Sequence, residues 1–273
     1  EVEPPRDSDA SRVLAASFDL KRAGVDAVTV PDSPLARMRM DSLALAACII
    51  QEIGMPAIPH ITCRDKNINA IQSGVLAAHY LGIRNVLAVT GDSISNAAMV
   101  KPVFNVSSFG LVQLLNSLNE KYFKGDEISL YGAVNVNAAN FEKELDRASI
   151  KVNHGAEALF TQPIHSQKGI EALKILKKAG LAKTIAGLMP IVSKRNALFL
   201  AHEFPGFLIP EDIISRFSDD MSAECNEKTA LDITVDIAKQ IRDYSDGFYI
   251  IVPFARTSLI IKLIERLKRC GII

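Results

Sequence analysis

Short apolar runs alternate with amphipathic stretches along almost the whole chain. An apolar run rich in β-branched residues and bounded by turn residues is typical of a buried strand, whereas apolar residues spaced three and four apart are typical of a helix. On this basis the pattern predicts strands over residues 25–31, 55–62, 84–92, 128–136, 157–163, 183–190 and 247–254.

A helical pattern follows each predicted strand. The predicted helices cover residues 39–54, 68–82, 107–120, 140–155, 166–180, 193–203, 229–244 and 257–270, with an irregular insertion before the seventh of them. Gly54, Gly82 and Gly180 stand where these helices are expected to stop, and Ser107 and Ser108 stand where an N-cap residue is expected. The chain is therefore predicted to be a series of strand–helix units.

The first residues, "EVEPPRD", decide how many such units there are. If residues 1–4 end another strand and residues 9–24 form its helix, the chain has eight units. Eight consecutive units without a change of composition favour a single (β/α)8 barrel domain over residues 1–273 rather than a doubly wound sheet. We expect further residues before Glu1 to complete that first strand. A frayed terminus is the competing interpretation of these residues.

Composition narrows the class of protein. The 31 Lys and Arg residues balance the 31 Asp and Glu residues, so no net field favours nucleic acid or an anionic membrane. No apolar run reaches the ~18 residues of a membrane span. The four cysteines are scattered, which fits a reducing compartment, and no closely spaced His/Cys/Asp cluster indicates a metal site. We therefore predict a cytoplasmic metabolic protein without a metal.

Polar side chains follow the predicted strands. Barrel enzymes build their sites at the carboxyl ends of the strands, so we expect these side chains to face one polar mouth. The residues at these positions are Glu1, Glu3, Thr29, Asp32, His60, Thr62, Thr90, Gly91, Asp92, Asn135, Gln162 and Arg256.

Several of these residues also have a purely structural interpretation. Asp92 could cap the turn that follows it, His60 could be a satisfied half-buried histidine, and Arg256 could pair with a surface acid. Gln162 is harder to explain in this way, because a strand-end glutamine before a proline faces the mouth. The "TGD" turn lacks the glycines and lysine of a P-loop, and neither GxGxxG nor HExxH occurs.

Four segments together resemble the methylenetetrahydrofolate reductase family: "EVEPPR", "PHITCRDKN", "HYLGIRNVLAVTGD" and "LFTQP". The chain is most similar to bacterial forms, including the reductase half of bifunctional homocysteine methyltransferase/methylenetetrahydrofolate reductase proteins. The resemblance implies a flavin-containing (β/α)8 barrel of one-carbon metabolism and methionine biosynthesis. It implies that FAD takes a hydride from NADH or NADPH and passes it to 5,10-methylenetetrahydrofolate, giving 5-methyltetrahydrofolate.

The resemblance also implies roles for individual residues. Glu1 rather than Glu3 matches the general acid that protonates N10 of the folate, because it lies three residues before the first proline of the "PP" motif. Asp92 matches the second catalytic residue, beside flavin and folate, and Gln162 and Arg256 match substrate-binding positions. The implied flavin-binding residues are Thr29, His60, Thr90, Gly91, Asp92, Ser107, Ser108, Asn135, Glu144 and Lys151.

Two pairs among these residues have a physical rationale. The seven-residue spacing of Glu144 and Lys151 keeps both on one helix face, where a lysine suits phosphates and a carboxylate suits ribose hydroxyls. Ser107 and Ser108 begin a predicted helix, where they could donate to the pyrophosphate.

The chain also departs from the family pattern. Lys194 replaces an aromatic residue expected in the substrate cleft, Thr90 stands where some members have arginine, and residues 134–135 replace a tyrosine-containing stretch. "GDSIS" stands where many members have two prolines after "GD". These departures leave two alternatives open: a flavin- or folate-binding subunit that needs a partner for electron delivery, and a flavin-free tetrahydrofolate methyltransferase. We also expect a homo-oligomer, with or without a partner subunit.

Overall fold

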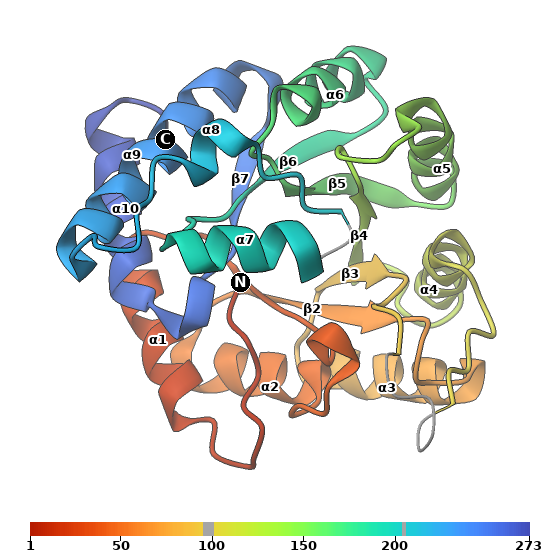
Figure 1. Cartoon of the computed structure of the whole chain (residues 1–273). Coiled ribbons are helices and arrows are strands. Elements are labelled where there is room, and N and C mark those ends of the chain that lie inside the picture. Colours follow the sequence, from red (N-terminus) through yellow and green to blue (C-terminus); the bar gives the residue numbers. More distant parts are fainter. Residues whose placement is uncertain (95–100, 204–205) are drawn as a thin grey trace. The chain divides into compact units, whose positions relative to one another are not determined.

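The computed structural model describes residues 1–94, 101–203 and 206–273 (Figure 1). These residues form two compact units. The first unit comprises Glu1–Ala133 and Ser149–Ala158, and the second comprises Val134–Ala148 and Leu159–Ile273.

The strands of the first unit pair in parallel in the order of the sequence. They are β1 (Val28–Val30), β2 (Ala57–Thr62), β3 (Asn85–Val89) and β4 (Ser129–Val134). In the register, Thr29 pairs with Ile58, His60 with Leu87 and Leu87 with Tyr131. Because parallel strands run in one direction, the residues that follow β1, β2 and β3 emerge at the same edge of this sheet.

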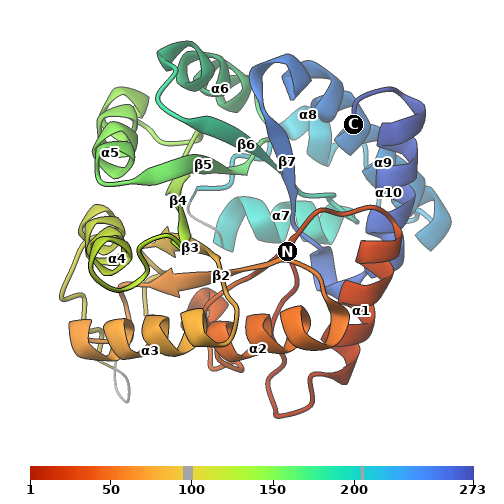
Figure 2. The same ribbon diagram turned by 180° about the vertical axis from the view of Figure 1, so that it is seen from behind.

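Helices cover the outside of these strands. They are α1 (Ser11–Arg22), α2 (Ser42–Cys48), which continues as the π-helical turn η2 (Ile49–Ile53), α3 (Ile68–Tyr80) and α4 (Ser108–Tyr122). The ribbons show α2 and α3 side by side beneath β2 and β3 in both views (Figures 1 and 2). The Ser42 hydroxyl donates to the His60 carbonyl at 2.8 Å and so ties α2 to β2.

The first ten residues form no regular strand, although they lie where the first strand is expected. The Val2 amide donates to the Thr29 carbonyl of β1 at 2.9 Å, and the Val2 side chain is buried. Pro4 and Pro5 come two and three residues later. Because proline has no N–H, they cannot continue the hydrogen bonds to β1. The Met40 amide instead donates to the Pro5 carbonyl at 2.9 Å, which holds the segment against the first unit.

The second unit contains the later strands and helices. Its strands are β5 (Ala156–Pro163), which belongs to this unit from Leu159, β6 (Lys183–Leu188) and β7 (Gly247–Ile250), hydrogen-bonded in that order. Its helices are α5 (Phe141–Asn153, shared with the first unit), α6 (Gln167–Ala179), α7 (Lys194–Glu203), α8 (Glu211–Ile214), α9 (Ala223–Ile241) and α10 (Thr257–Arg269). The described residues also include the 3₁₀ turns η1 (Pro34–Ala36), η3 (Arg242–Tyr244) and η4 (Pro253–Ala255).

Close packing of β5 on β6 fixes one residue of the second unit. A Cβ on Gly187 would lie 2.7 Å from the Thr161 carbonyl oxygen and 2.8 Å from that of Gln162, so only glycine fits there. The Gly187 amide donates to the Thr161 hydroxyl at 2.8 Å. Around these strands, buried residues of β6, α6, α9 and α10 form a continuous apolar core.

The sequence-based fold class is confirmed: the described residues are an α/β chain of parallel strands alternating with helices, with the element order of a (β/α)8 barrel. The single domain over residues 1–273 stays a prediction. Several boundaries differ from the prediction, and two of them have a local explanation. Helix α9 already begins at Ala223, because the Ser222 hydroxyl caps it by accepting from the Cys225 amide. Strand β7 ends at Ile250 and does not reach residue 254, because Pro253 lacks an N–H and Phe254 adopts left-handed backbone.

Candidate functional site

Six polar residues gather where β1, β2 and β3 of the first unit end, and we call them the strand-end cluster. They are Glu1, Thr29, Asp32, His60, Arg64 and Asp92. Five of them are among the residues expected at strand ends, and Arg64 is an addition from the structure.

The structure separates the two N-terminal carboxylates. Glu3 forms an ion pair with Arg39, and its side chain is 46% exposed. The side chain of Glu1 is only 18% exposed, and its Oε2 lies 4.0 Å from Nε2 of His60. Glu3 is therefore engaged by a neighbouring cation, while Glu1 is the carboxyl that lies within the strand-end cluster.

His60 lies on β2 and is buried. Burial, followed by the positive charge of the N-terminal amino group, lowers the pKa of its imidazole to about 4, although the nearby Asp32 carboxylate acts in the opposite direction. The ring is therefore neutral at pH 7, and Glu1 faces an uncharged imidazole. The Nε2 atom of His60 has no hydrogen-bond partner within the described residues, so the interpretation as a satisfied core histidine is incomplete at this atom.

Two aspartates connect the strand ends to one another. Oδ2 of Asp32 accepts from the amide of Thr62 at 3.2 Å and from its hydroxyl at 2.9 Å, which joins the end of β1 to the end of β2. Oδ2 of Asp92 accepts from the Leu35 amide at 2.6 Å. This contact of Asp92 is with the loop after β1 and not with the turn that follows Asp92.

Gly91 makes the close approach of the β3 end possible. Its φ is +91°, a conformation that L side chains rarely adopt. A Cβ at this position would also lie 3.0 Å from Cβ of Thr62 and 3.1 Å from Cβ of Arg64. Thr90, directly before it, is exposed.

Sequence reasoning missed Arg64. Its side chain is 1% exposed, and Nε and Nη2 both donate to the Asp65 carboxylate, at 2.9 and 2.6 Å. The sequence contained one signal for it. Arg64 and Asp65 come directly after a buried strand, a position where an ion pair on the protein surface is not expected.

Several buried polar atoms at these strand ends, and one on Arg39 shortly before α2, have no hydrogen-bond partner within the described part of the chain. They are Thr29 Oγ1, Arg39 Nε, His60 Nε2 and Arg64 Nη1. Buried polar groups are almost always paired in folded proteins, so atoms of this kind mark a place where a ligand can complete the hydrogen bonds. The arginine nitrogens and the Thr29 hydroxyl can donate hydrogen bonds, and the His60 nitrogen can donate or accept one. Such groups fit a polar heterocycle such as a flavin ring, which offers carbonyl and ring-nitrogen acceptors.

The residues expected at the flavin phosphates are engaged within the protein. The Ser107 hydroxyl caps α4 by accepting from the Gly110 amide at 3.2 Å, and Ser108 is buried. Lys151 is buried too, and its ammonium donates to the Ala133 carbonyl. A role of these side chains at phosphates stays a prediction.

In the second unit the structure brings Asn135 and Glu144 together, since the Asn135 amide donates to Oε1 of Glu144 at 3.1 Å. Gln162 lies within β5, one residue before its end, and Arg256 follows β7. Both side chains are exposed, and no ion pair of Arg256 with an acid occurs among the described residues. Lys194 begins α7 and pairs with Asp219 at 2.9 Å.

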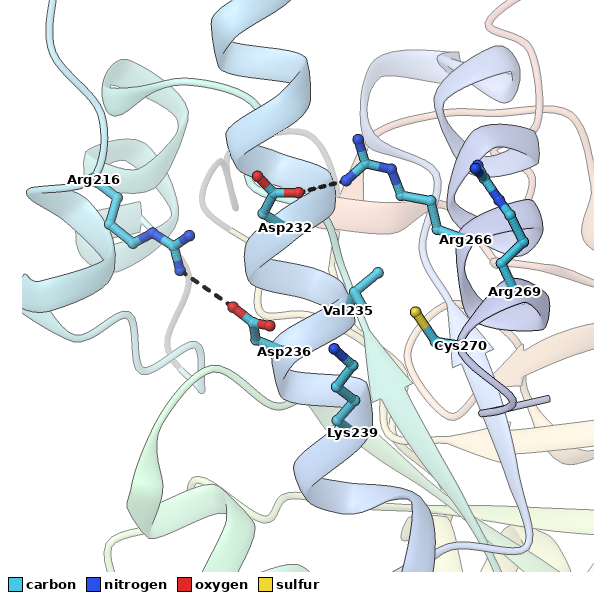
Figure 3. Close-up of a pocket in the computed structure, with 8 residues that line it drawn as sticks. All are labelled: Arg216, Asp232, Val235, Asp236, Lys239, Arg266, Arg269 and Cys270. Carbon is cyan, nitrogen blue, oxygen red and sulfur yellow. Dashed lines mark hydrogen bonds and ion pairs between the residues drawn. The ribbon is translucent and has the colours of Figure 1, made fainter.

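The second unit also has a cavity of about 470 Å³ on the outer faces of α9 and α10 (Figure 3). Arg266 pairs there with Asp232, and Arg216 pairs with Asp236 at 3.8 Å. The other residues that line the cavity are Val235, Lys239, Arg269 and Cys270. None of the predicted site residues is among them.

Neither a metal centre nor a membrane span is found in the parts of the chain that the structure describes. No group of three or more His, Cys, Asp or Glu side chains in those residues could hold a metal ion. No helix in them is long and apolar enough to cross a membrane.

Comparison with known proteins decides the family. A family model described as methylenetetrahydrofolate reductase matches residues 1–268. The chain belongs to this family. The match covers nearly the whole chain and includes all segments that carry the resemblance in the sequence.

Solved structures of similar fold include an uncharacterized protein from Clostridium thermocellum that binds two copies of 5-methyl-5,6,7,8-tetrahydrofolic acid. It is 14% identical, with a TM-score of 0.66 over 98% of this chain and 93% of its own. A 2,3-dimethylmalate lyase of the PEP mutase/isocitrate lyase superfamily is 14% identical, with a TM-score of 0.55 over 99% of this chain and 82% of its own. A putative lyase/mutase from Burkholderia cenocepacia is 12% identical, with a TM-score of 0.52 over 99% and 84%. At these identities the likeness shows the fold alone.

Proposed function

We propose that this member of the methylenetetrahydrofolate reductase family reduces 5,10-methylenetetrahydrofolate to 5-methyltetrahydrofolate, with FAD as cofactor and NADH or NADPH as reductant. The family match over residues 1–268 supports this proposal. The observation that carries it is the position of Glu1, a largely enclosed carboxyl 4.0 Å from His60, next to buried polar atoms that have no hydrogen-bond partner among the described residues.

Bound FAD supplies the hydride transfer, and the protein supplies binding, orientation and the proton. Thr29 and His60 are the residues of the first unit that would hold the flavin, because Oγ1 of Thr29 and Nε2 of His60 are buried and unpaired in the described chain. Gly91 allows the β3 end to approach them closely.

Glu1 would hold a proton on its carboxyl group and donate it to N10 of the folate. Protonation of N10 opens the five-membered ring to the iminium ion, whose methylene carbon accepts the hydride. A positive imidazolium beside Glu1 would favour the ionised carboxylate. Because the pKa of His60 is lowered to about 4, the imidazole is neutral at pH 7 and does not act in this way.

Asp92 would place a negative charge near the cationic folate. Its Oδ2 accepts from the Leu35 amide at 2.6 Å, which fixes the carboxylate relative to the end of β1. Gln162 and Arg256 belong to the second unit and are exposed, and their role in binding the folate stays a prediction from the family resemblance.

The test is the absorption spectrum of the purified protein with added FAD. We expect visible flavin bands that NADH or NADPH bleaches and that 5,10-methylenetetrahydrofolate then restores, with 5-methyltetrahydrofolate as the product. A protein that binds FAD but forms no product from the reduced state would contradict the reductase assignment.

A second candidate is a folate-binding subunit that receives electrons from a partner. The Clostridium thermocellum protein of similar fold binds two copies of a methylated folate, and Lys194 here stands where the family has an aromatic residue. Flavin that dithionite reduces, but neither NADH nor NADPH reduces, would favour this candidate. Methyl transfer by colourless protein would favour a flavin-free methyltransferase instead. The homo-oligomer, the partner subunit and the cytoplasmic location stay predictions.

A further inference from the structure

The loop after β1 has an unusual backbone for its sequence. Ser33, Leu35 and Ala36 all have left-handed backbone, with φ values of 46°, 57° and 54°, and none of them is glycine. L-residues adopt this conformation at an energetic cost, and such strain persists only where the surrounding contacts hold it in place. Contacts with other parts of the first unit must therefore hold the loop in this conformation.

Arg64 is one source of these contacts. Its Nη2 donates to the carbonyl of Ser33 at 3.1 Å, and the carbonyl of Asp32 lies 3.5 Å from the same nitrogen. Nε and Nη2 grip the Asp65 carboxylate, which fixes the plane of the guanidinium. With a side chain only 1% exposed, Arg64 has little freedom to adopt another rotamer.

Asp92 holds the same loop from the other side. Its carboxylate accepts from the Leu35 amide at 2.6 Å, two residues along the loop from the carbonyl that Arg64 binds. Gly91 packs against Arg64 directly, since a Cβ there would lie 3.1 Å from Cβ of Arg64. The loop is thus fixed between the end of β2 and the end of β3.

The charges around Arg64 suit this position. Burial acts to lower the pKa of Arg64, but the carboxylates of Asp65, Asp32 and Asp92 outweigh it and raise the pKa above its ordinary value. The guanidinium is therefore permanently charged. The single positive charge of Arg64 pairs directly with Asp65 and lies near the negative charges of Asp32 and Asp92. A neutral residue of similar size would leave these carboxylates without a compensating charge.

We propose that Arg64 is a positioning residue that fixes the loop of residues 33–36 and thereby sets the position of the Asp92 carboxylate. The proposal deepens the proposed function and rests on it as far as turnover is concerned. Its structural part concerns the first unit alone and is independent of the reaction.

The test compares Arg64→Met and Arg64→Lys with the matched control Arg84→Met. Arg84 also grips a carboxylate through Nε and Nη2, that of Asp126 at 2.8 and 2.6 Å, but it stands before the start of β3, whereas Arg64 follows the end of β2. Hydrogen exchange of the Leu35 amide is measured on the folded proteins without ligand. We expect exchange at least about tenfold faster in Arg64→Met, an intermediate rate in Arg64→Lys and no change in Arg84→Met. Unchanged exchange in both Arg64 variants would overturn the proposal.

Steady-state turnover is the second readout. Misplacement of a catalytic group costs about 10–100-fold in rate, so we expect kcat to fall by that factor in Arg64→Met while KM changes little. Arg64→Lys should recover part of the loss. A fall of kcat in Arg84→Met as large as in Arg64→Met would contradict the role. If Arg64→Met does not fold, Arg64→Lys carries both readouts. If the wild type reduces no folate, the proposed function fails, while the exchange of Leu35 still decides the role of Arg64.

Discussion

The strand-end cluster of the first unit and the cavity of the second unit both gather charged side chains, but they expose them to different extents. The arginines and aspartates of the two cavity pairs are 31–57% exposed. In the strand-end cluster, by contrast, the side chain of Arg64 is 1% exposed and that of Glu1 is 18% exposed, although Asp92 of the same cluster is exposed. The cavity has its carboxylates paired, whereas the cluster has buried polar atoms without partners in the described chain.

This difference has a physical consequence. Exposed ion pairs are screened by water and contribute about 0–1 kcal/mol, so the cavity pairs have little influence on reactivity or stability. Buried polar groups interact in a medium of lower dielectric constant, where a single proton or hydrogen bond counts for more. The enclosure of Glu1, His60 and Arg64, rather than the number of charges, therefore distinguishes the region where we expect catalysis.

The largest expected effect is on turnover. Replacing Glu1 with Gln removes the proposed proton donor with little change of shape, and we expect folate reduction to fall by about 10²–10⁴-fold. Reduction of the bound flavin by NADH or NADPH should continue at the wild-type rate, as followed by stopped-flow absorbance. The control is Asp232→Asn in the cavity, which should leave both half-reactions unchanged. Retained turnover in Glu1→Gln would remove the proton-donor role.

The next effect is on the pH dependence of stability. The pKa of His60 falls from 6.5 to about 4 on folding, so between these pH values the unfolded chain binds a proton that the folded chain does not. One pKa unit corresponds to about 1.4 kcal/mol, so this difference changes the free energy of unfolding by about 3 kcal/mol. This stability is present above pH 6.5 and is lost as the pH falls toward 4. Denaturant unfolding should therefore show a flatter pH profile for His60→Gln. The exposed His202 provides the control, and an equal flattening in His202→Gln would contradict this cause.

Two glycines with positive φ separate crowding from backbone strain. Gly91 has φ +91° and close neighbours in Thr62 and Arg64. Gly180 has φ +61°, and no atom of the described residues would lie within 4 Å of a Cβ at this position. Gly180→Ala should cost about 1–2 kcal/mol of unfolding free energy from the left-handed backbone alone. Gly91→Ala should cost about 1–3 kcal/mol more because of overpacking. Equal losses in urea unfolding would show that the β3 end is not tightly packed on β2.

The smallest effect contrasts two aspartates. Asp232 forms a surface pair with Arg266, so Asp232→Asn should change the free energy of unfolding by less than about 1 kcal/mol. Asp32 accepts two hydrogen bonds from Thr62 in a part-buried position, and Asp32→Asn should cost about 1–3 kcal/mol. If Asp232→Asn were the more destabilising, the comparison of the two regions would be wrong.

The fold was predictable because its signal is local and periodic. Strand β2 and helix α3 each carry a complete pattern, and their observed bounds lie within two residues of the predicted ones. The start of α9 was also readable, since Ser222 is a favourable N-cap residue, but the prediction began that helix too late. The irregular Glu1–Pro5 segment was less predictable, because its backbone is held by single contacts to β1 and Met40.

The site was predictable only in part. Strand alternation places Glu1 and Glu3 on one face, and what separates them is Arg39, which is distant in sequence. Arg64 was not found, because its burial depends on the loop after β1 and the turn after β3, which meet only in the folded chain. Lys151 illustrates the reverse case: its residue type suits a phosphate, but its ammonium is directed to the Ala133 carbonyl.

A crystal structure of the protein with FAD and 5-methyltetrahydrofolate would show which of the two regions binds the ligands. We predict density for the flavin against Thr29 and His60 at the ends of β1 and β2, with the folate N10 within hydrogen-bonding reach of Glu1. Density for either ligand in the cavity lined by Arg216, Asp236 and Arg266, with none at the strand-end cluster, would contradict the account.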